Sequence, residues 1–162
     1  MSGAVYDCAV VVLSDRAATG VRPDGCVPVV REALGAGFQI VDERILADEP
    51  AALQAALIEL ADAGVPLVLT SGGTGLVPRD RTPQATAAVL DYEVPGMAEA
   101  MRAASLRVVA TAMLSRAVAG VRDHTLIVNL PGSPKAVRET LAVILPALPH
   151  ALELLANKVV DG

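Results

Sequence analysis

Short runs of apolar residues recur along the chain, separated by segments in which apolar residues repeat at helical spacing. Apolar runs at 5–13, 65–69 and 125–130 predict strands buried on both faces, as in the middle of a parallel sheet. Residues 38–46 alternate instead, which predicts an outer strand. Strict alternation would place Ile40, Asp42, Arg44 and Leu46 on one face, and Val41, Glu43 and Ile45 on the other.

Start and stop signals divide the rest of the chain into helices. Proline follows a polar residue in Glu49-Pro50, Thr82-Pro83 and Ser133-Pro134, and the Thr82 and Ser133 hydroxyls are expected to cap their helices. Further helices are expected at 27–34 and 95–104, and Pro146 and Pro149 should interrupt the last helix, which runs to about residue 157. The order of strands and helices predicts an α/β fold, a three-layer α/β/α sandwich with a mainly parallel sheet, formed by one domain of residues 1–162.

Composition narrows the class of protein. Hydrophobic residues make up 53% of the 162 residues, but no run of about twenty is uninterrupted, so we expect no transmembrane helix. The first residues lack the pattern of a signal peptide, and two cysteines, Cys8 and Cys26, make neither a disulfide framework nor a zinc pattern, which favours a cytoplasmic protein. A net charge of −5 and an aromatic content of 2% argue against nucleic-acid binding.

Two glycine-rich turns are the strongest functional signal. Residues 70–75 read Thr-Ser-Gly-Gly-Thr-Gly directly after one apolar run, and residues 130–134 read Leu-Pro-Gly-Ser-Pro at the end of another. At the carboxyl ends of parallel strands, glycines let backbone N–H groups approach an anion. A tight turn explains one or two glycines but not three, and the residues match neither the dinucleotide fingerprint nor the P-loop. They predict a site for a small anion, such as a phosphate, between two strand ends.

Charged residues near these turns supply candidate metal ligands. Asp80 lies between Arg79 and Arg81, so it can hold a divalent cation while the arginines face phosphate oxygens; the alternative is a solvated loop with a local ion pair. Asp48 follows the outer strand and offers a second carboxylate, or else caps the next helix. Weaker candidates, which taken alone also fit ordinary polar loops, are Ser14, Asp15, Ser115 and Arg116.

The combination of motifs is more specific than any one of them. In chain order the motifs are Ser14-Asp15-Arg16, Asp48, residues 70–75, residues 79–83, residues 95–99, Ser115-Arg116 and residues 130–134. Together they resemble the MogA/MoaB family, the molybdopterin-binding proteins of molybdenum cofactor biosynthesis, which are related to the G domain of gephyrin. The resemblance covers nearly the whole chain.

The resemblance implies an enzyme, a molybdopterin adenylyltransferase that transfers AMP from Mg²⁺-bound ATP to the terminal phosphate of molybdopterin and releases pyrophosphate. It implies that Asp48 and Asp80 are the catalytic residues and the Mg²⁺ ligands. It gives Glu99 a role in orienting the pocket or in structure. The residues expected to bind molybdopterin and ATP are Ser14, Asp15, Ser71, Gly72, Gly73, Thr74, Gly75, Thr82, Ser115, Arg116, Pro131, Gly132 and Ser133.

Three further expectations come from the family. The alternative function is that of a MoaB-type protein, which binds molybdopterin or a related pterin with little or no transfer. The family also implies a homo-oligomer, with a trimer favoured over a hexamer, and a transient contact with a molybdenum-insertion protein. One position departs from the family pattern, because Val27 stands where glycine is usual. If that glycine needs a positive φ, the first loop must differ in this chain.

Overall fold

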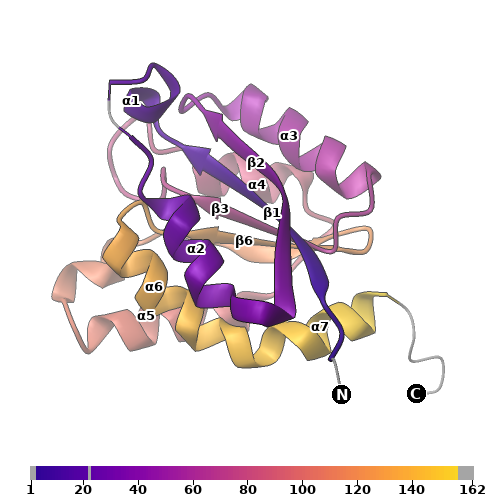
Figure 1. Cartoon of the computed structure of the whole chain (residues 1–162). Helices are drawn as coiled ribbons and strands as arrows, with labels where there is room; N and C mark the ends of the chain where they lie inside the picture. Colours follow the sequence, from indigo (N-terminus) through magenta and orange to yellow (C-terminus); the bar gives the residue numbers. More distant parts are fainter. Residues whose placement is uncertain (1–2, 22, 157–162) are drawn as a thin grey trace.

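The structure, a computed structural model, describes residues 3–21 and 23–156 and contains a six-stranded sheet (Figure 1). From edge to edge the strand order is β2-β1-β3-β6-β5-β4. The first four strands in this order are parallel, and β5 and β4 are each antiparallel to the preceding neighbour. The predicted mainly parallel sheet is therefore confirmed. The strands are β1 (Tyr6–Leu13), β2 (Phe38–Leu46), β3 (Leu67–Ser71), β4 (Tyr92–Glu93), β5 (Ala119–Arg122) and β6 (Thr125–Leu130).

Helices cover both faces of the sheet, as expected for a three-layer α/β/α sandwich (Figure 1). One face packs against α3 (Pro50–Asp62) and α4 (Thr82–Val89). The other packs against α2 (Cys26–Leu34), α5 (Pro95–Leu106), α6 (Pro134–Ile144) and α7 (Leu148–Leu155). Successive residues of β1 join opposite cores, because neighbouring side chains of a strand point to opposite faces. The short helices are α1 (Asp15–Ala18), η1 (Gly35–Gly37), η2 (Ala110–Leu114) and η3 (Leu145–Ala147).

The antiparallel edge of the sheet was not predicted from the sequence. β5 and β6 form a hairpin through a tight turn in which Asp123 has a φ of 51°. β5 gives only a weak strand signal, because it is short and contains Gly120. Packing explains this glycine, since a Cβ there would lie 2.5 Å from both Leu90 Cδ1 and the Tyr92 carbonyl oxygen. The close approach of β4 thus requires a residue that weakens the strand pattern.

β2 is an edge strand, as predicted, but its faces do not follow strict alternation. Its pairing with β1 shifts by one residue, so that Ile40 and Asp42 pair with adjacent residues of β1. Val41 is the extra residue of this β-bulge. Before the bulge Ile40 packs on the core beneath α2, whereas after it Leu46 packs on the core beneath α3. The prediction that Ile40, Asp42 and Leu46 share one face is therefore wrong.

The structure confirms one of the two predicted hydroxyl caps and contradicts the other. Ser133 caps α6 as predicted, because its Oγ accepts a hydrogen bond from the Ala136 N–H at 3.2 Å. Thr82 is instead the first residue of α4, and Arg81 occupies the cap position without a side-chain hydrogen bond. The prediction of a Thr82 cap is wrong because this side chain is buried against the first glycine-rich turn.

The C-terminal helix is interrupted where the prolines predict. The chain leaves α6 at Ile144, passes through η3, which contains Pro146, and continues as α7, which contains Pro149. The predicted helix end near residue 157 lies outside the described residues, and α7 ends at Leu155. No helix in the described ranges is long and apolar enough to cross a lipid bilayer.

Candidate active site

The carboxyl ends of β1, β2, β3 and β6 lie along one edge of the sheet and border an open cleft of about 780 Å³. This is the position where open parallel sheets bind ligands. The loops that follow these four strands line the cleft, together with the segment that leads into α2. The predicted site residues that the cleft brings together are Ser14, Asp15, Asp48, Ser71, Gly72, Gly73, Asp80, Gly132 and Ser133.

The first glycine-rich turn has a backbone that excludes larger residues. Gly72 and Gly73 have φ values of 101° and 71°, which L side chains rarely adopt. A Cβ on Gly72 would lie 2.4 Å from the Leu13 carbonyl oxygen, and one on Gly73 would lie 2.2 Å from Thr82 Oγ1. Both glycines are therefore needed for the fold of the turn, in addition to leaving the cleft open.

The two glycine-rich turns contact each other. The Ser71 hydroxyl donates to the Pro131 carbonyl oxygen at 2.7 Å, and the Gly72 N–H donates to the Leu130 carbonyl oxygen at 3.1 Å. A Cβ on Gly132 would lie 3.4 Å from Gly72 Cα. The turns therefore form one continuous wall of the cleft.

Asp48 and Asp80 both lie against the first glycine-rich turn. A Cβ on Gly73 would be 3.5 Å from Asp48 Oδ1, and one on Gly75 would be 2.9 Å from Asp80 Oδ2. Partial burial, and to a smaller extent the charges of Asp15 and Asp80, raise the pKa of the Asp48 carboxyl above its ordinary value. Glu49, rather than Asp48, occupies the cap position of α3. The Asp48 carboxylate therefore faces the cleft and does not cap the helix.

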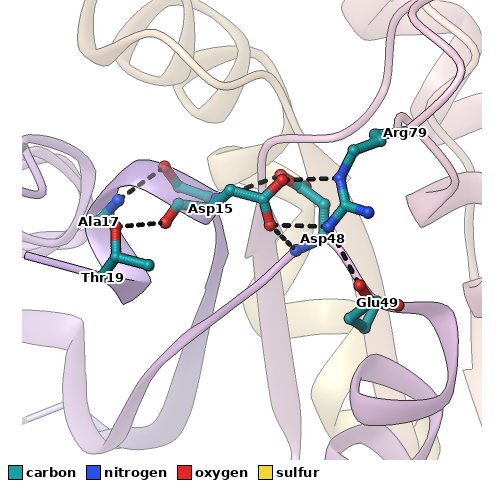
Figure 2. Close-up of polar contacts among 7 residues, drawn as sticks. Asp15, Ala17, Thr19, Asp48, Glu49 and Arg79 are labelled. Carbon is teal, nitrogen blue, oxygen red and sulfur yellow. Dashed lines mark hydrogen bonds and ion pairs between the residues drawn. The ribbon is translucent and has the colours of Figure 1, made fainter. Parts of the chain in front are cut away.

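Arg79 binds carboxylates of two neighbouring loops (Figure 2). Its Nε and one terminal nitrogen donate to the two oxygens of Asp15 at 2.7 and 2.9 Å, and that terminal nitrogen also donates to Glu49 at 3.1 Å. The Arg79 guanidinium holds the pKa of the Asp15 carboxyl below its ordinary value. The sequence suggested that Arg79 faces phosphate oxygens, whereas in this structure its partners are carboxylates.

Three other predicted residues do not line the cleft, and two of them, Arg116 and Thr82, support the first turn. The Arg116 guanidinium donates to the carbonyl oxygens of Gly75, at 2.9 Å, and Asp80. Its backbone N–H donates to the Thr74 carbonyl oxygen at 2.9 Å. Thr82 N–H donates to the Gly73 carbonyl oxygen at 3.1 Å. Ser115 Oγ, next to Arg116, accepts from the Ala117 N–H at 3.4 Å.

A second cavity of about 370 Å³ lies beyond the first turn, bordered by α5, η2 and α6. Its lining is mostly apolar and includes Met101, Val109 and Leu114. The predicted site residues that border it are Thr74, Gly75, Ser115, Pro131 and Ser133. The predicted site residues are therefore divided between the cleft and this second cavity. Their spacing along the chain did not show this division. Glu99 is exposed on α5.

The segment before α2 contributes to the cleft although it was not among the predicted site residues. Residues 23–26 line the cleft, and the Asp24 carboxylate accepts hydrogen bonds from the N–H groups of Cys26 and Val27, the first two residues of α2, at 2.8 and 3.0 Å. Val27 is buried in the first turn of α2 and is not among the residues with positive φ. The usual glycine is therefore replaced at a position where this chain has ordinary helical backbone. The sequence feature that could have pointed to this segment is an Asp directly before a helical pattern.

Comparison with known proteins agrees with this geometry. The family described as "Probable molybdopterin binding domain" matches residues 9–150. The chain belongs to this family. It is 42% identical to the molybdopterin adenylyltransferase of Escherichia coli K12, over 93% of this chain and 86% of that protein. It is also 38% identical to gephyrin of Dictyostelium discoideum, over 92% of this chain and 22% of gephyrin.

Solved structures support the same assignment. The crystal structure of the molybdopterin biosynthesis enzyme MoaB from Thermus thermophilus has a TM-score of 0.89 and 49% identity, and the match covers 94% of this chain and 97% of that one. The predicted membership of the MogA/MoaB family and its α/β fold are thereby confirmed.

The donor chemistry of Asp48 and Asp80 suits Mg²⁺, which prefers carboxylate oxygens. Neither Asp48 nor Asp80 forms an ion pair within the described residues, and both border the same glycine-rich turn. In the described part of the chain, no group of three or more His, Cys, Asp or Glu residues could hold a metal ion. Mg²⁺ commonly takes one or two carboxylates and completes its shell with water and substrate phosphates.

Proposed function

We propose that the protein is a Mg²⁺-dependent molybdopterin adenylyltransferase, which transfers AMP from ATP to the terminal phosphate of molybdopterin. The family and its relatives support a role in molybdenum cofactor biosynthesis. The observation that carries the specific activity is the position of Asp48 and Asp80 against the same glycine-rich turn, in the cleft at the carboxyl ends of the strands. This arrangement suits a ligand with several phosphates.

In this reaction the nucleophile belongs to the substrate. A terminal phosphate oxygen of molybdopterin attacks the α-phosphorus of ATP and forms a new P–O bond. The bond from the α-phosphorus to the oxygen that bridges to the β-phosphate breaks, and pyrophosphate leaves with that electron pair. Because the attacking oxygen is already anionic, the protein has to position the two phosphates and offset their repulsion rather than supply a nucleophile.

The residues of the cleft have separate tasks in this proposal. Asp48 and Asp80 would hold Mg²⁺, which when bound neutralises charge on the phosphates. The turn formed by Gly72 and Gly73 lets phosphates approach its backbone without a side chain in the way. Ser71 fixes the distance between the two glycine-rich turns through its hydrogen bond to the Pro131 carbonyl oxygen.

Adenylyl transfer itself tests the proposal. Purified protein is incubated with molybdopterin, ATP and Mg²⁺, and adenylyl-molybdopterin and pyrophosphate are followed by chromatography. We expect product from the wild type and a loss of at least about 100-fold in Asp80→Asn, with molybdopterin binding nearly unchanged. Asp62→Asn is the matched control, because Asp62 is exposed at the far end of α3. Unchanged turnover in Asp80→Asn would remove the assigned role of this carboxylate.

A binding protein without transferase activity is the second candidate. The observation that favours it is the description of the matching family, which names molybdopterin binding and no transfer. The same experiment separates the two functions. Tight molybdopterin binding with no adenylylated product in the presence of ATP and Mg²⁺ would support the binding protein.

We also propose that the chain forms a homotrimer. Five large apolar side chains are between 43% and 62% exposed within one short segment, which suits burial against another copy. They are Leu106, Val108, Val109, Met113 and Leu114. Light scattering coupled to gel filtration should give three times the 16.6 kDa chain mass, and a monomer at micromolar concentration would contradict the proposal. Contact with a molybdenum-insertion protein stays a prediction.

A further inference from the structure

Arg79 connects three of the loops that form the cleft (Figure 2). It binds Asp15, in the segment after β1, through two nitrogen atoms, and Glu49, in the segment after β2, through one. Arg79 itself lies in the segment after β3 and directly precedes Asp80. One guanidinium group therefore links the segment that carries Asp80 to the segments that carry Asp15 and Asp48.

Asp15 transmits this restraint to Asp48 through the backbone. The Asp48 N–H donates to Asp15 Oδ1 at 2.9 Å, and the Asp15 N–H donates to Asp48 Oδ2 at 3.2 Å. These two hydrogen bonds fix both the main chain of Asp48 and the direction of its carboxylate. The Asp15 carboxylate accepts from the Asp48 main chain and from Arg79 at the same time, so it lies at the centre of the connection.

The charges of the cleft explain why such a connection is needed. Asp48 and Asp80 are both acidic, and neither forms an ion pair within the described residues. Before a metal ion binds, their mutual repulsion favours separation of the two segments. Arg79 opposes that separation from outside the pair, because its ion pairs are with Asp15 and Glu49 and not with Asp48 or Asp80.

We propose that Arg79 and Asp15 are positioning residues that set the separation of the Asp48 and Asp80 carboxylates and thereby the affinity for Mg²⁺. They act on Asp48 through its backbone N–H and on Asp80 through the peptide bond that joins it to Arg79. The proposal rests on the proposed function in one respect, since it takes Asp48 and Asp80 as the metal ligands.

Metal binding is measured directly with the full chain. Mn²⁺, which replaces Mg²⁺ as a paramagnetic probe, is titrated in the presence of an ATP analogue with a methylene group between the α- and β-phosphates, and free Mn²⁺ is counted by electron paramagnetic resonance. We expect Arg79→Gln to weaken Mn²⁺ binding about 10- to 100-fold, the range found for residues that orient metal ligands. Arg79→Lys should recover part of this loss, because it keeps the charge but not the two-nitrogen contact.

A matched control exists elsewhere in the chain. Arg44 binds Asp42 through two nitrogen atoms and also binds Glu59, and none of these three residues lines the cleft. Arg44→Gln therefore removes similar interactions and should leave Mn²⁺ binding unchanged. The Mg²⁺ dependence of adenylyl transfer gives a second measurement. In Arg79→Gln the Mg²⁺ concentration for half-maximal rate should rise about as much as Mn²⁺ binding weakens, while the rate at saturating Mg²⁺ stays near that of the wild type.

The outcomes distinguish this proposal from the proposed function. If the wild type transfers AMP but Arg79→Gln binds Mn²⁺ as tightly as Arg44→Gln does, the positioning role is wrong and the transferase stands. If the wild type transfers no AMP but Arg79→Gln still weakens Mn²⁺ binding, the transferase is wrong and the positioning role stands. If Arg79→Gln does not fold, as judged by circular dichroism, Asp15→Asn decides on the same criterion, since it keeps an oxygen acceptor and removes the charge that Arg79 binds.

Discussion

Two arginines of this protein form nearly the same set of contacts in different parts of the fold. In the edge network (Asp42, Arg44 and Glu59), Arg44 binds both oxygens of Asp42 at 3.0 Å and both oxygens of Glu59 at 3.0 and 3.2 Å. In the cleft network (Asp15, Glu49 and Arg79), Arg79 binds both oxygens of Asp15 and one of Glu49 (Figure 2). The chemistry of the two networks is alike, but they connect different parts of the molecule.

The edge network joins residues that are already held together. Asp42 and Arg44 are two residues apart in β2, and Glu59 lies on α3, which packs on the same face of the sheet. The cleft network joins three segments that follow three different strands, β1, β2 and β3. An ion pair of given strength therefore adds little order at the edge of the sheet and much more in the cleft, where it determines the relative position of functional groups.

The largest difference between the two regions should lie in their tolerance of backbone change. Gly73 has a φ of 71°, and a Cβ there would lie 2.2 Å from Thr82 Oγ1. We expect Gly73→Ala to lower the free energy of unfolding by about 2 kcal/mol or more, from backbone strain and the clash together. Val41→Ala, at the bulge of β2, should lower it by less than about 1 kcal/mol, because this side chain is 48% exposed. Urea unfolding of both variants tests this, and equal losses would contradict it.

The next largest effect should be on activity. Asp15→Ala removes the acceptor for the Asp48 N–H and for Arg79, so we expect adenylyl transfer at limiting Mg²⁺ to fall about 100-fold. Asp42→Ala removes the corresponding acid of the edge network and should change transfer by less than about twofold. Initial rates at one limiting and one saturating Mg²⁺ concentration check both expectations. A similar loss in the two variants would mean that the cleft network has no special role.

The sequence predicted the centre of the fold because burial there leaves a direct pattern. β3 and β6 are buried along their whole length, and each is an apolar run followed by a glycine-rich turn. The hairpin edge was missed because Gly120 is required by packing against β4, which no local pattern reveals. The bulge at Val41 was missed because a sequence that alternates gives no sign of a shift in pairing.

The candidate site was predictable in position but not in its contacts. Asp48 and Asp80 follow strand ends, so their meeting at one edge of the sheet follows from parallel topology. The partner of Arg79 could not be predicted in the same way, because Asp15 lies 64 residues away and a phosphate suits a guanidinium as well as a carboxylate does. Local sequence indicates which residues reach the edge, whereas the choice among partners depends on distances set by the whole fold.

The smallest effect should be the pH dependence of stability conferred by the edge network. Hydrogen bonds from Arg44 lower the pKa of the Asp42 carboxyl below its ordinary value, and that of Glu59 likewise. Because the pKa in the folded state lies below that in the unfolded state, the stabilisation is complete above the unfolded-state pKa. It is lost as the pH falls through the folded-state pKa.

Arg44→Gln should therefore lower the free energy of unfolding at pH 7 and have progressively less effect below about pH 4. The Arg44 and Asp42 side chains are 24% and 32% exposed, so we expect a difference of at most about 1 kcal/mol, which shrinks further in high salt because solvent and ions screen the pair. Urea unfolding of both proteins at pH 7 and pH 3, in low and high salt, measures it. A difference that stayed the same at pH 3 and in high salt would show that Arg44 stabilises the strand through packing of its aliphatic stem rather than through its charge.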